Sequence, residues 1–145
     1  FTLFINKTSP KWSIIQANTQ AEMLIWYTNS QTQYRISGLI EELAPSVIEH
    51  NWHRRPTASK YMDYSYESLG SQSSQIDARD DLIRHIKELK EEHPEEELVT
   101  PESAVGIILH PEVIEMLDLN SPDRIHDRRR FVFTDGEWRS TQLIP

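Results

Sequence analysis

The chain has 145 residues, of which 37% are hydrophobic and 26% charged, and its formal net charge is −8. This length suits one domain with a real core, the acidic balance argues against a nucleic-acid binder, and the sequence contains no apolar run of about 18 residues or more that would cross a membrane. The absence of cysteine excludes disulfides, thiolate metal sites and a cysteine nucleophile, and it is compatible with a reducing compartment. We therefore expect a soluble, cytoplasmic protein with a single domain over residues 1–145.

The first third of the sequence predicts a strand, a short helix and a pair of strands. Residues 1–5 are apolar and strand-like, and Ser9 followed by Pro10 is typical of a helix start, which predicts a helix over residues 10–18. The apolar run 21–28 and the alternating stretch 32–43 flank a polar turn and predict an antiparallel pair. Because the chain begins directly in a strand-like stretch, we expect further strands upstream in the native protein.

The middle of the sequence predicts helices. Pro45 opens a helical pattern over residues 45–54, Pro56 interrupts it, and the stretch that follows favours a second short helix. The best-defined helix covers residues 77–92, with Asp77 as its expected N-cap. Its apolar stripe at helical spacing consists of Leu82, Ile83, Ile86 and Leu89.

The last third of the sequence predicts strands again. Asp135 and Gly136 form a strong two-residue hairpin signal between the last two of them. The expected strands cover residues 104–110, 112–117, 130–134 and 137–144. Strands at both ends with helices between them predict an α+β domain in which an antiparallel sheet or barrel carries the core.

Positive charge gathers just before the last hairpin of this acidic chain. Five basic residues fall within seven positions: Arg124, His126, Arg128, Arg129 and Arg130. In an extended backbone Arg124, His126 and Arg128 would point to one side, where they could converge on one anion. The alternative is that Arg124 and Arg128 pair with Asp123 and Asp127 as a surface ion network.

Three other stretches carry groups suited to an anion. Arg55 and Ser59 lie four residues apart across Pro56, Lys11 lies in the first turn of a helix, and Gln72 with Ser73 could donate or accept hydrogen bonds. Each stretch also has a structural interpretation, as solvated cations at a helix end or as a flexible loop. The six histidines show no pair at ligand spacing on a shared face, so we expect no metal site.

Together these stretches resemble the pyridoxamine 5'-phosphate oxidase family, which consists of FMN-binding flavoproteins. The similar segments follow the family's order and cover nearly the whole chain: "SPK", "QYRISGLIEEL", "HRRPTASK", "SQSSQIDAR", "HPEVIEML", "DRIHDRRRF" and "GEWRSTQLIP". The early stretch "WYTNSQTQYRISG" is more similar to a related branch known only as FMN-binding proteins.

The resemblance implies a fold, a cofactor and a set of site residues. The implied fold is an antiparallel split β-barrel with flanking helices, assembled as a homodimer with FMN at the subunit interface. The implied FMN contacts are Lys11 at the phosphate, Gln33, Gln72, Ser73 and Arg128. The implied substrate contacts are Arg55 and Ser59 at the phosphate, with Arg124 and His126 at the pyridine ring as the catalytic residues.

The implied activity is oxidation of pyridoxine or pyridoxamine 5'-phosphate to pyridoxal 5'-phosphate, with O2 as the electron acceptor. The substrate would lose a hydride from its C4' carbon to the flavin, and O2 would become H2O2. The sequence departs from the family pattern at Asn51, Thr57 and Leu117, where the family usually has Tyr, Arg and Trp. The alternative is therefore a related FMN-binding protein with a different redox substrate or none.

Overall fold

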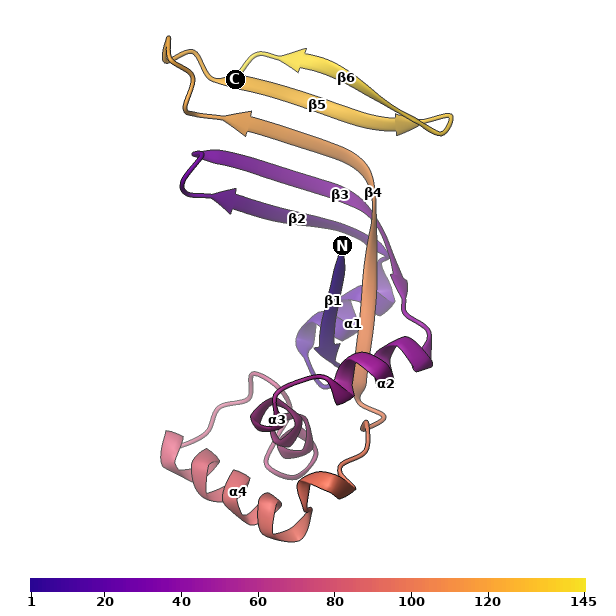
Figure 1. The fold of residues 1–145 in the computed structure, drawn as a ribbon, viewed down its shortest axis with the longest axis vertical. Coiled ribbons are helices and arrows are strands. Elements are labelled where there is room, and N and C mark those ends of the chain that lie inside the picture. Colours follow the sequence, from indigo (N-terminus) through magenta and orange to yellow (C-terminus); the bar gives the residue numbers. More distant parts are fainter. The chain divides into compact units, whose positions relative to one another are not determined.

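The computed structural model describes residues 1–145 and contains one antiparallel sheet of six strands together with four α-helices and a short 3-10 helix (Figure 1). The strands are β1 (Thr2–Asn6), β2 (Gln20–Tyr27), β3 (Thr32–Glu42), β4 (Ala104–Asp118), β5 (Asp127–Thr134) and β6 (Glu137–Leu143). The helices are α1 (Pro10–Ala17), α2 (Pro45–His53), α3 (Thr57–Ser68), α4 (Arg79–Glu92) and the 3-10 helix η1 (Glu95–Glu97). The α+β class and the helices expected over 10–18, 45–54 and 77–92 are confirmed.

The chain forms two compact units. The strand unit comprises Phe1, Asn18–Glu41 and Leu109–Pro145, and the helical unit comprises Thr2–Ala17 and Glu42–Ile108. No helix in either unit has the length and apolar character needed to cross a membrane. The expectation of a single domain stays a prediction.

The strand unit is built from two hairpins joined through β4. Strands β2 and β3 pair antiparallel with Met23 opposite Ile36, and β5 pairs with both β4 and β6. The strand order is β2-β3-β4-β5-β6, so the outer strands β2 and β6 each pair on one side only and the sheet is open within one chain. A Cβ on Gly38 would lie 1.9 Å from the carbonyl oxygen of His110, so only glycine allows β3 to approach β4 this closely.

Strand β4 corrects one prediction, because residues 104–110 and 112–117 form one continuous strand. Its first half pairs with β1 up to Ile108, and its second half pairs with β5 from Val113 onward. Pro111 lies between these two paired segments, where its missing N–H removes no hydrogen bond to β1 or β5. Pro111 is therefore tolerated inside the strand.

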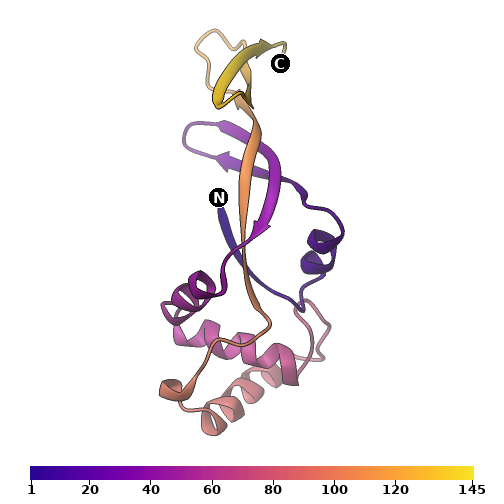
Figure 2. The same cartoon turned by 90° about the vertical axis from the view of Figure 1, so that its right-hand side faces the viewer.

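The helical unit has its core where α2, α3 and α4 meet. Trp52, Tyr61, Leu89 and Leu98 form a buried cluster, and α3 packs against α4 (Figure 2). Helix α1 begins as expected, with the Ser9 hydroxyl oxygen accepting the Lys11 N–H at 3.3 Å. Helix α4 begins later than expected, at Arg79 with Ala78 as N-cap, so the prediction of Asp77 as the cap was wrong.

Candidate functional site

Two loops of the helical unit that are far apart in the sequence meet beside the start of α1. The backbone N–H of Gln72 donates to the hydroxyl oxygen of Thr8 at 3.1 Å, across 64 positions of sequence. Thr8 in turn donates from its N–H at 2.9 Å and from its hydroxyl at 2.7 Å to the side-chain oxygen of Asn6. Ser73 follows with a φ of 75°, and Lys11 is exposed in the first turn of α1. The structure thus brings the segments of Lys11, Gln72 and Ser73 together.

The start of α3 carries the second predicted set, and its main cation already has a partner. A guanidinium N–H of Arg55 donates to the carboxylate of Asp63, and a second one reaches the carbonyl oxygen of Ser59 at 3.5 Å. The indole N–H of Trp52 donates to the same Asp63 oxygen at 2.7 Å. Nearby, the hydroxyl of Thr57 donates to Glu95. Arg55 and Ser59 therefore lie together as predicted, but among carboxylates.

Sequence reasoning missed Asp63, which is only 5% exposed. Burial raises the pKa of its carboxyl above the ordinary value, against the opposing effects of the Arg55 charge and the hydrogen bonds from Trp52 and Arg55. The available signal was a lone acid inside the aromatic stretch "YMDYSY", four residues after Ser59 and so on the same helical face.

The strand unit brings Gln33 and Arg128 together at a small pocket. A cavity of about 170 Å³ is lined by Gln33, Arg35, Glu115, Met116, Leu117 and Arg128. Arg128 donates to Glu115 at 2.9 Å, and Arg130 approaches the other oxygen of the same carboxylate at 4.0 Å. Leu117, one of the departures from the family pattern, lies directly opposite Arg128 in the β4–β5 register.

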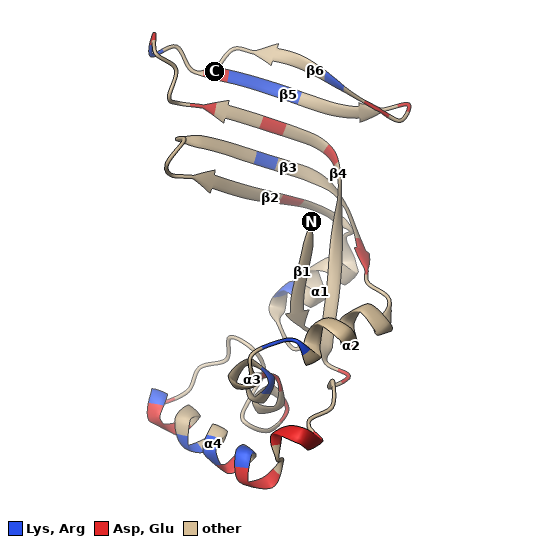
Figure 3. Ribbon diagram, in the orientation of Figure 1, with Lys and Arg blue, Asp and Glu red and all other residues tan.

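The expected ion network exists with different partners. Arg129 instead of Arg128 pairs with Asp127, at 2.8 Å, because residues two apart on a strand share a face. Gln142 donates to Asp127 at 2.7 Å, and this bond, followed by that from Arg129, holds the pKa of the Asp127 carboxyl below its usual value. Figure 3 shows positive charge running along β5 and negative charge gathered at η1 in the helical unit.

The alternation expected from Arg124 to Arg128 is wrong at its first member. Arg124 has a φ of 60° and donates its backbone N–H to Ser121 at 3.0 Å, so it lies in a turn before β5. Asp123 accepts the N–H of Ile125 at 2.9 Å and makes no ion pair with Arg124. Arg124 and His126 are both exposed in this loop, and only Arg128 lies within the strand.

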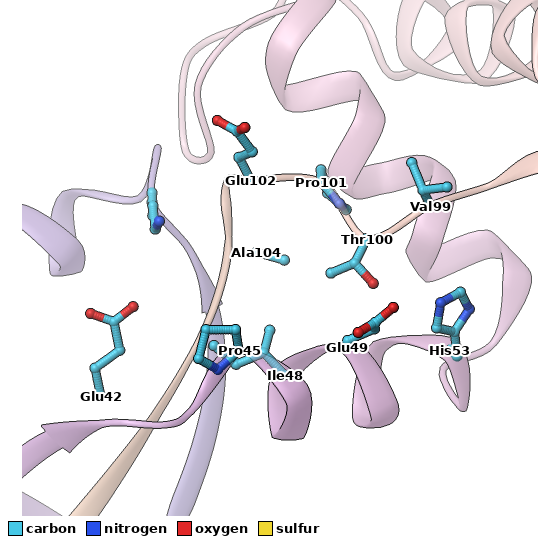
Figure 4. Close-up of a pocket in the computed structure, with 11 residues that line it drawn as sticks. Glu42, Pro45, Ile48, Glu49, His53, Val99, Thr100, Pro101, Glu102 and Ala104 are labelled. Atoms are coloured by element: carbon cyan, nitrogen blue, oxygen red, sulfur yellow. The ribbon is translucent and has the colours of Figure 1, made fainter.

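A larger cavity, of about 460 Å³, lies elsewhere in the helical unit (Figure 4). It is lined mainly by α2 and the segment 99–104, including Glu49, His53 and Glu102, and Thr100 has a buried hydroxyl without a partner. None of the site residues predicted from the sequence lines it.

No family model matches the chain, but individual proteins do over its whole length. A pyridoxine/pyridoxamine 5'-phosphate oxidase of Microcystis aeruginosa is 32% identical over 146 residues, which is all of this chain and 66% of that protein. The oxidases of the same name from Erythrobacter litoralis and Pseudomonas putida are 29% and 30% identical, with 68% and 65% of their lengths covered. The chain thus spans about two thirds of the length of these curated relatives.

Solved structures show the same fold. PhzG from Burkholderia lata, in complex with tetrahydrophenazine-1-carboxylic acid, matches with a TM-score of 0.82 and 27% identity over 99% of this chain and 68% of its own. A pyridoxamine 5'-phosphate oxidase-related, FMN-binding protein from Nostoc punctiforme matches with a TM-score of 0.77 and 16% identity over 99% of this chain and 72% of its own. The fold class inferred from the sequence is therefore confirmed. From the fold and the relatives together, the chain belongs to the family of pyridoxine/pyridoxamine 5'-phosphate oxidases and their FMN-binding relatives.

Proposed function

We propose that this protein is an FMN-dependent oxidase that converts pyridoxine or pyridoxamine 5'-phosphate to pyridoxal 5'-phosphate. The observation that carries the proposal is the 32% identity to an oxidase of that name over the entire chain. The two clusters of anion-binding groups in the helical unit support it, because a phosphorylated flavin and a phosphorylated substrate together need two such sites.

The residues present suit FMN by the chemistry of their donors. Lys11 beside the Gln72–Ser73 loop offers a cation, amide and hydroxyl groups to a phosphate, and Gln33 with Arg128 offers hydrogen bonds at one small pocket. When bound, FMN would supply a hydride acceptor and pass the electrons to O2.

The proposed substrate contacts divide into a phosphate site and a ring site. Arg55 and Ser59 at the start of α3 would hold the phosphate, and Arg124 with His126 would contact the pyridine ring. The reaction removes a hydride from C4' and a proton from the attached oxygen of pyridoxine 5'-phosphate, while O2 takes up two electrons and two protons to give H2O2. Arg124 would polarise the pyridine substrate near the reacting carbon.

A homodimer is part of the proposal, as is a cytoplasmic location. Large apolar side chains are exposed on the strand unit, among them Leu24 at 61%, Trp26 at 46% and Trp138 at 44%. Such side chains are typical of a surface that a partner covers. Light scattering at micromolar concentration tests this, and a monomer would contradict it.

A second candidate is a flavoprotein that acts on a different substrate. The specific observation in its favour is that Arg55 and Thr57, both near the expected phosphate position, already bind the carboxylates of Asp63 and Glu95. The similar protein PhzG was solved in complex with tetrahydrophenazine-1-carboxylic acid, a compound that carries a carboxylic acid and no phosphate.

The deciding experiment measures flavin binding and turnover separately. The purified protein is saturated with FMN, its visible spectrum is recorded, and H2O2 release is followed with pyridoxine and pyridoxamine 5'-phosphate. In Arg124→Leu, FMN affinity should stay within a few fold while turnover falls at least about a hundredfold. Tight FMN binding by the parent without any H2O2 release would reject the oxidase in favour of the second candidate.

A further inference from the structure

A buried carboxylate lies behind the cation that is expected to bind the substrate phosphate. Asp63 belongs to the second turn of α3, and its side chain is 7% exposed, while that of Arg55 is 34% exposed. Arg55 therefore reaches both the protein interior and the surface. Whatever anion approaches Arg55 from solvent meets a guanidinium whose charge is already shared with Asp63.

The position of Asp63 is fixed from two directions. The Trp52 indole N–H binds the same oxygen as Arg55, and Trp52 is itself only 1% exposed in the core. Lys60 is a further cation on α3, but its ammonium lies over the Trp52 ring at 5.5 Å from the ring centroid and it makes no ion pair. Asp63 thus cannot turn away from Arg55 without breaking a buried hydrogen bond.

We infer that Asp63 is a specificity-determining residue of the anion subsite at the start of α3, where its buried carboxylate partly neutralises Arg55 and weakens the binding of dianions more than that of monoanions. The inference rests on the proposed function only in assigning Arg55 to a phosphate. Charge repulsion between Asp63 and a ligand grows in proportion to the ligand's charge, so a dianion loses twice the binding free energy that a monoanion loses.

The surrounding charges favour the same outcome. The hydroxyl of Thr57, at the first position of α3, donates to Glu95. Glu95 lies in η1 together with Glu96 and Glu97, so three carboxylates are grouped in this short helix. Five donors of a guanidinium are enough to bind Asp63 and an external anion together. Asp63 therefore tunes the subsite and does not block it.

The experiment compares Asp63→Asn with the parent, using sulfate as a dianion and methanesulfonate as a monoanion of similar shape. Asparagine keeps an acceptor for the Trp52 N–H and removes the negative charge. Binding is followed through the backbone amide NMR signals of residues 57–60, which report this subsite alone. In Asp63→Asn we expect sulfate to bind about tenfold more tightly and methanesulfonate about threefold. The monoanion gains half the binding free energy that the dianion gains, so its factor is the square root of the first.

The matched control is Asp81→Asn, which makes the same change of net charge in the same unit. Asp81 pairs with Arg84 on α4, away from the subsite. It should leave both affinities unchanged. If both variants bound sulfate more tightly by the same factor, the change in net charge alone would explain the effect and the inference would fail. Unchanged or weaker sulfate binding in Asp63→Asn would also overturn the inference.

Two further variants keep the test decisive. Asp63→Ser also removes the charge and offers a hydroxyl to Trp52, so it replaces Asp63→Asn if the latter does not fold. Arg55→Ala should weaken sulfate binding by itself, because Arg55 supplies the attraction that Asp63 offsets; an unchanged sulfate affinity in Arg55→Ala would contradict the inference.

Turnover separates this inference from the proposed function. If the protein oxidises pyridoxine 5'-phosphate, Asp63→Asn should lower KM about tenfold and leave kcat unchanged, as expected for a contact made equally in the ground and transition states. An absence of turnover together with tighter sulfate binding would reject the oxidase and support the inference. Turnover with an unchanged KM and an unchanged sulfate affinity would support the oxidase and reject the inference.

Discussion

Replacing Arg128 by alanine is the sharpest test of the flavin contacts expected in the strand unit. Arg128 shares a small pocket with Gln33 and is held at 2.9 Å from Glu115. The side chains of this ion pair are 35% and 22% exposed. One guanidinium nitrogen is therefore engaged within the protein, and the others remain free for a ligand.

Arg128→Ala should change FMN affinity and the free energy of unfolding by different amounts. A charge-assisted hydrogen bond to FMN is worth about 1.5–3 kcal/mol, while a partly exposed ion pair with Glu115 contributes about 1 kcal/mol or less to folding. At about 1.4 kcal/mol per factor of ten, Arg128→Ala should weaken FMN tenfold or more. Its free energy of unfolding should change far less, since Arg130 remains 4.0 Å from Glu115.

The assay is a fluorescence titration of FMN with each variant, alongside urea unfolding without flavin. Arg129→Ala is the matched control, because it removes the same charge from the neighbouring position, which faces the other side of β5 and pairs with Asp127. Parent-like FMN binding by Arg128→Ala, or an equal loss in Arg129→Ala, would show that Arg128 does not contact the flavin.

Three other changes test separate parts of the account. Lys11→Ala should weaken FMN roughly tenfold in the same titration, and unchanged affinity would remove the α1 start from the flavin site. Gly38→Ala should cost about 1–3 kcal/mol of unfolding free energy in urea, because the added Cβ meets the His110 carbonyl; a parent-like midpoint would contradict that close contact. Gln142→Leu should destabilise the protein at neutral pH. Because the pKa of Asp127 is lower in the folded protein than in the unfolded chain, its contacts stabilise the folded protein at pH values above the unfolded pKa. The stability difference between the parent and Gln142→Leu should therefore fade as pH drops through the acid range. A stability difference that is independent of pH would rule Asp127 out as the cause.

Local signals in the sequence were enough for the helices. The predicted 45–54 and the observed Pro45–His53 differ by one residue, because proline at a helix start and the interruption at Pro56 act within one turn. The Asp135–Gly136 hairpin formed for the same reason, with φ of 56° and 80° at its two turn residues.

Charge partners could not be predicted in this way, since they depend on register. Arg128 meets Glu115 only because β4 and β5 align Leu117 with Arg128 and Glu115 with Arg130. Arg124 has a positive φ, which its side chain does not favour and which no neighbouring residue signals. The extended stretch expected from Arg124 to Arg128 was wrong on that account.

The predicted cations therefore fall into two classes that differ in how they can bind an anion. Arg55 and Arg128 each hold a carboxylate of the protein, Asp63 and Glu115. Lys11 and Arg124 are exposed and make no ion pair. An anion at the first pair must share the cation with an internal competitor, whereas an anion at the second pair displaces only water. Because the competing carboxylates repel a dianion more than a monoanion, charge selectivity in this acidic protein should arise at Arg55 and Arg128. Lys11 and Arg124, by contrast, should contribute affinity that depends mainly on salt concentration.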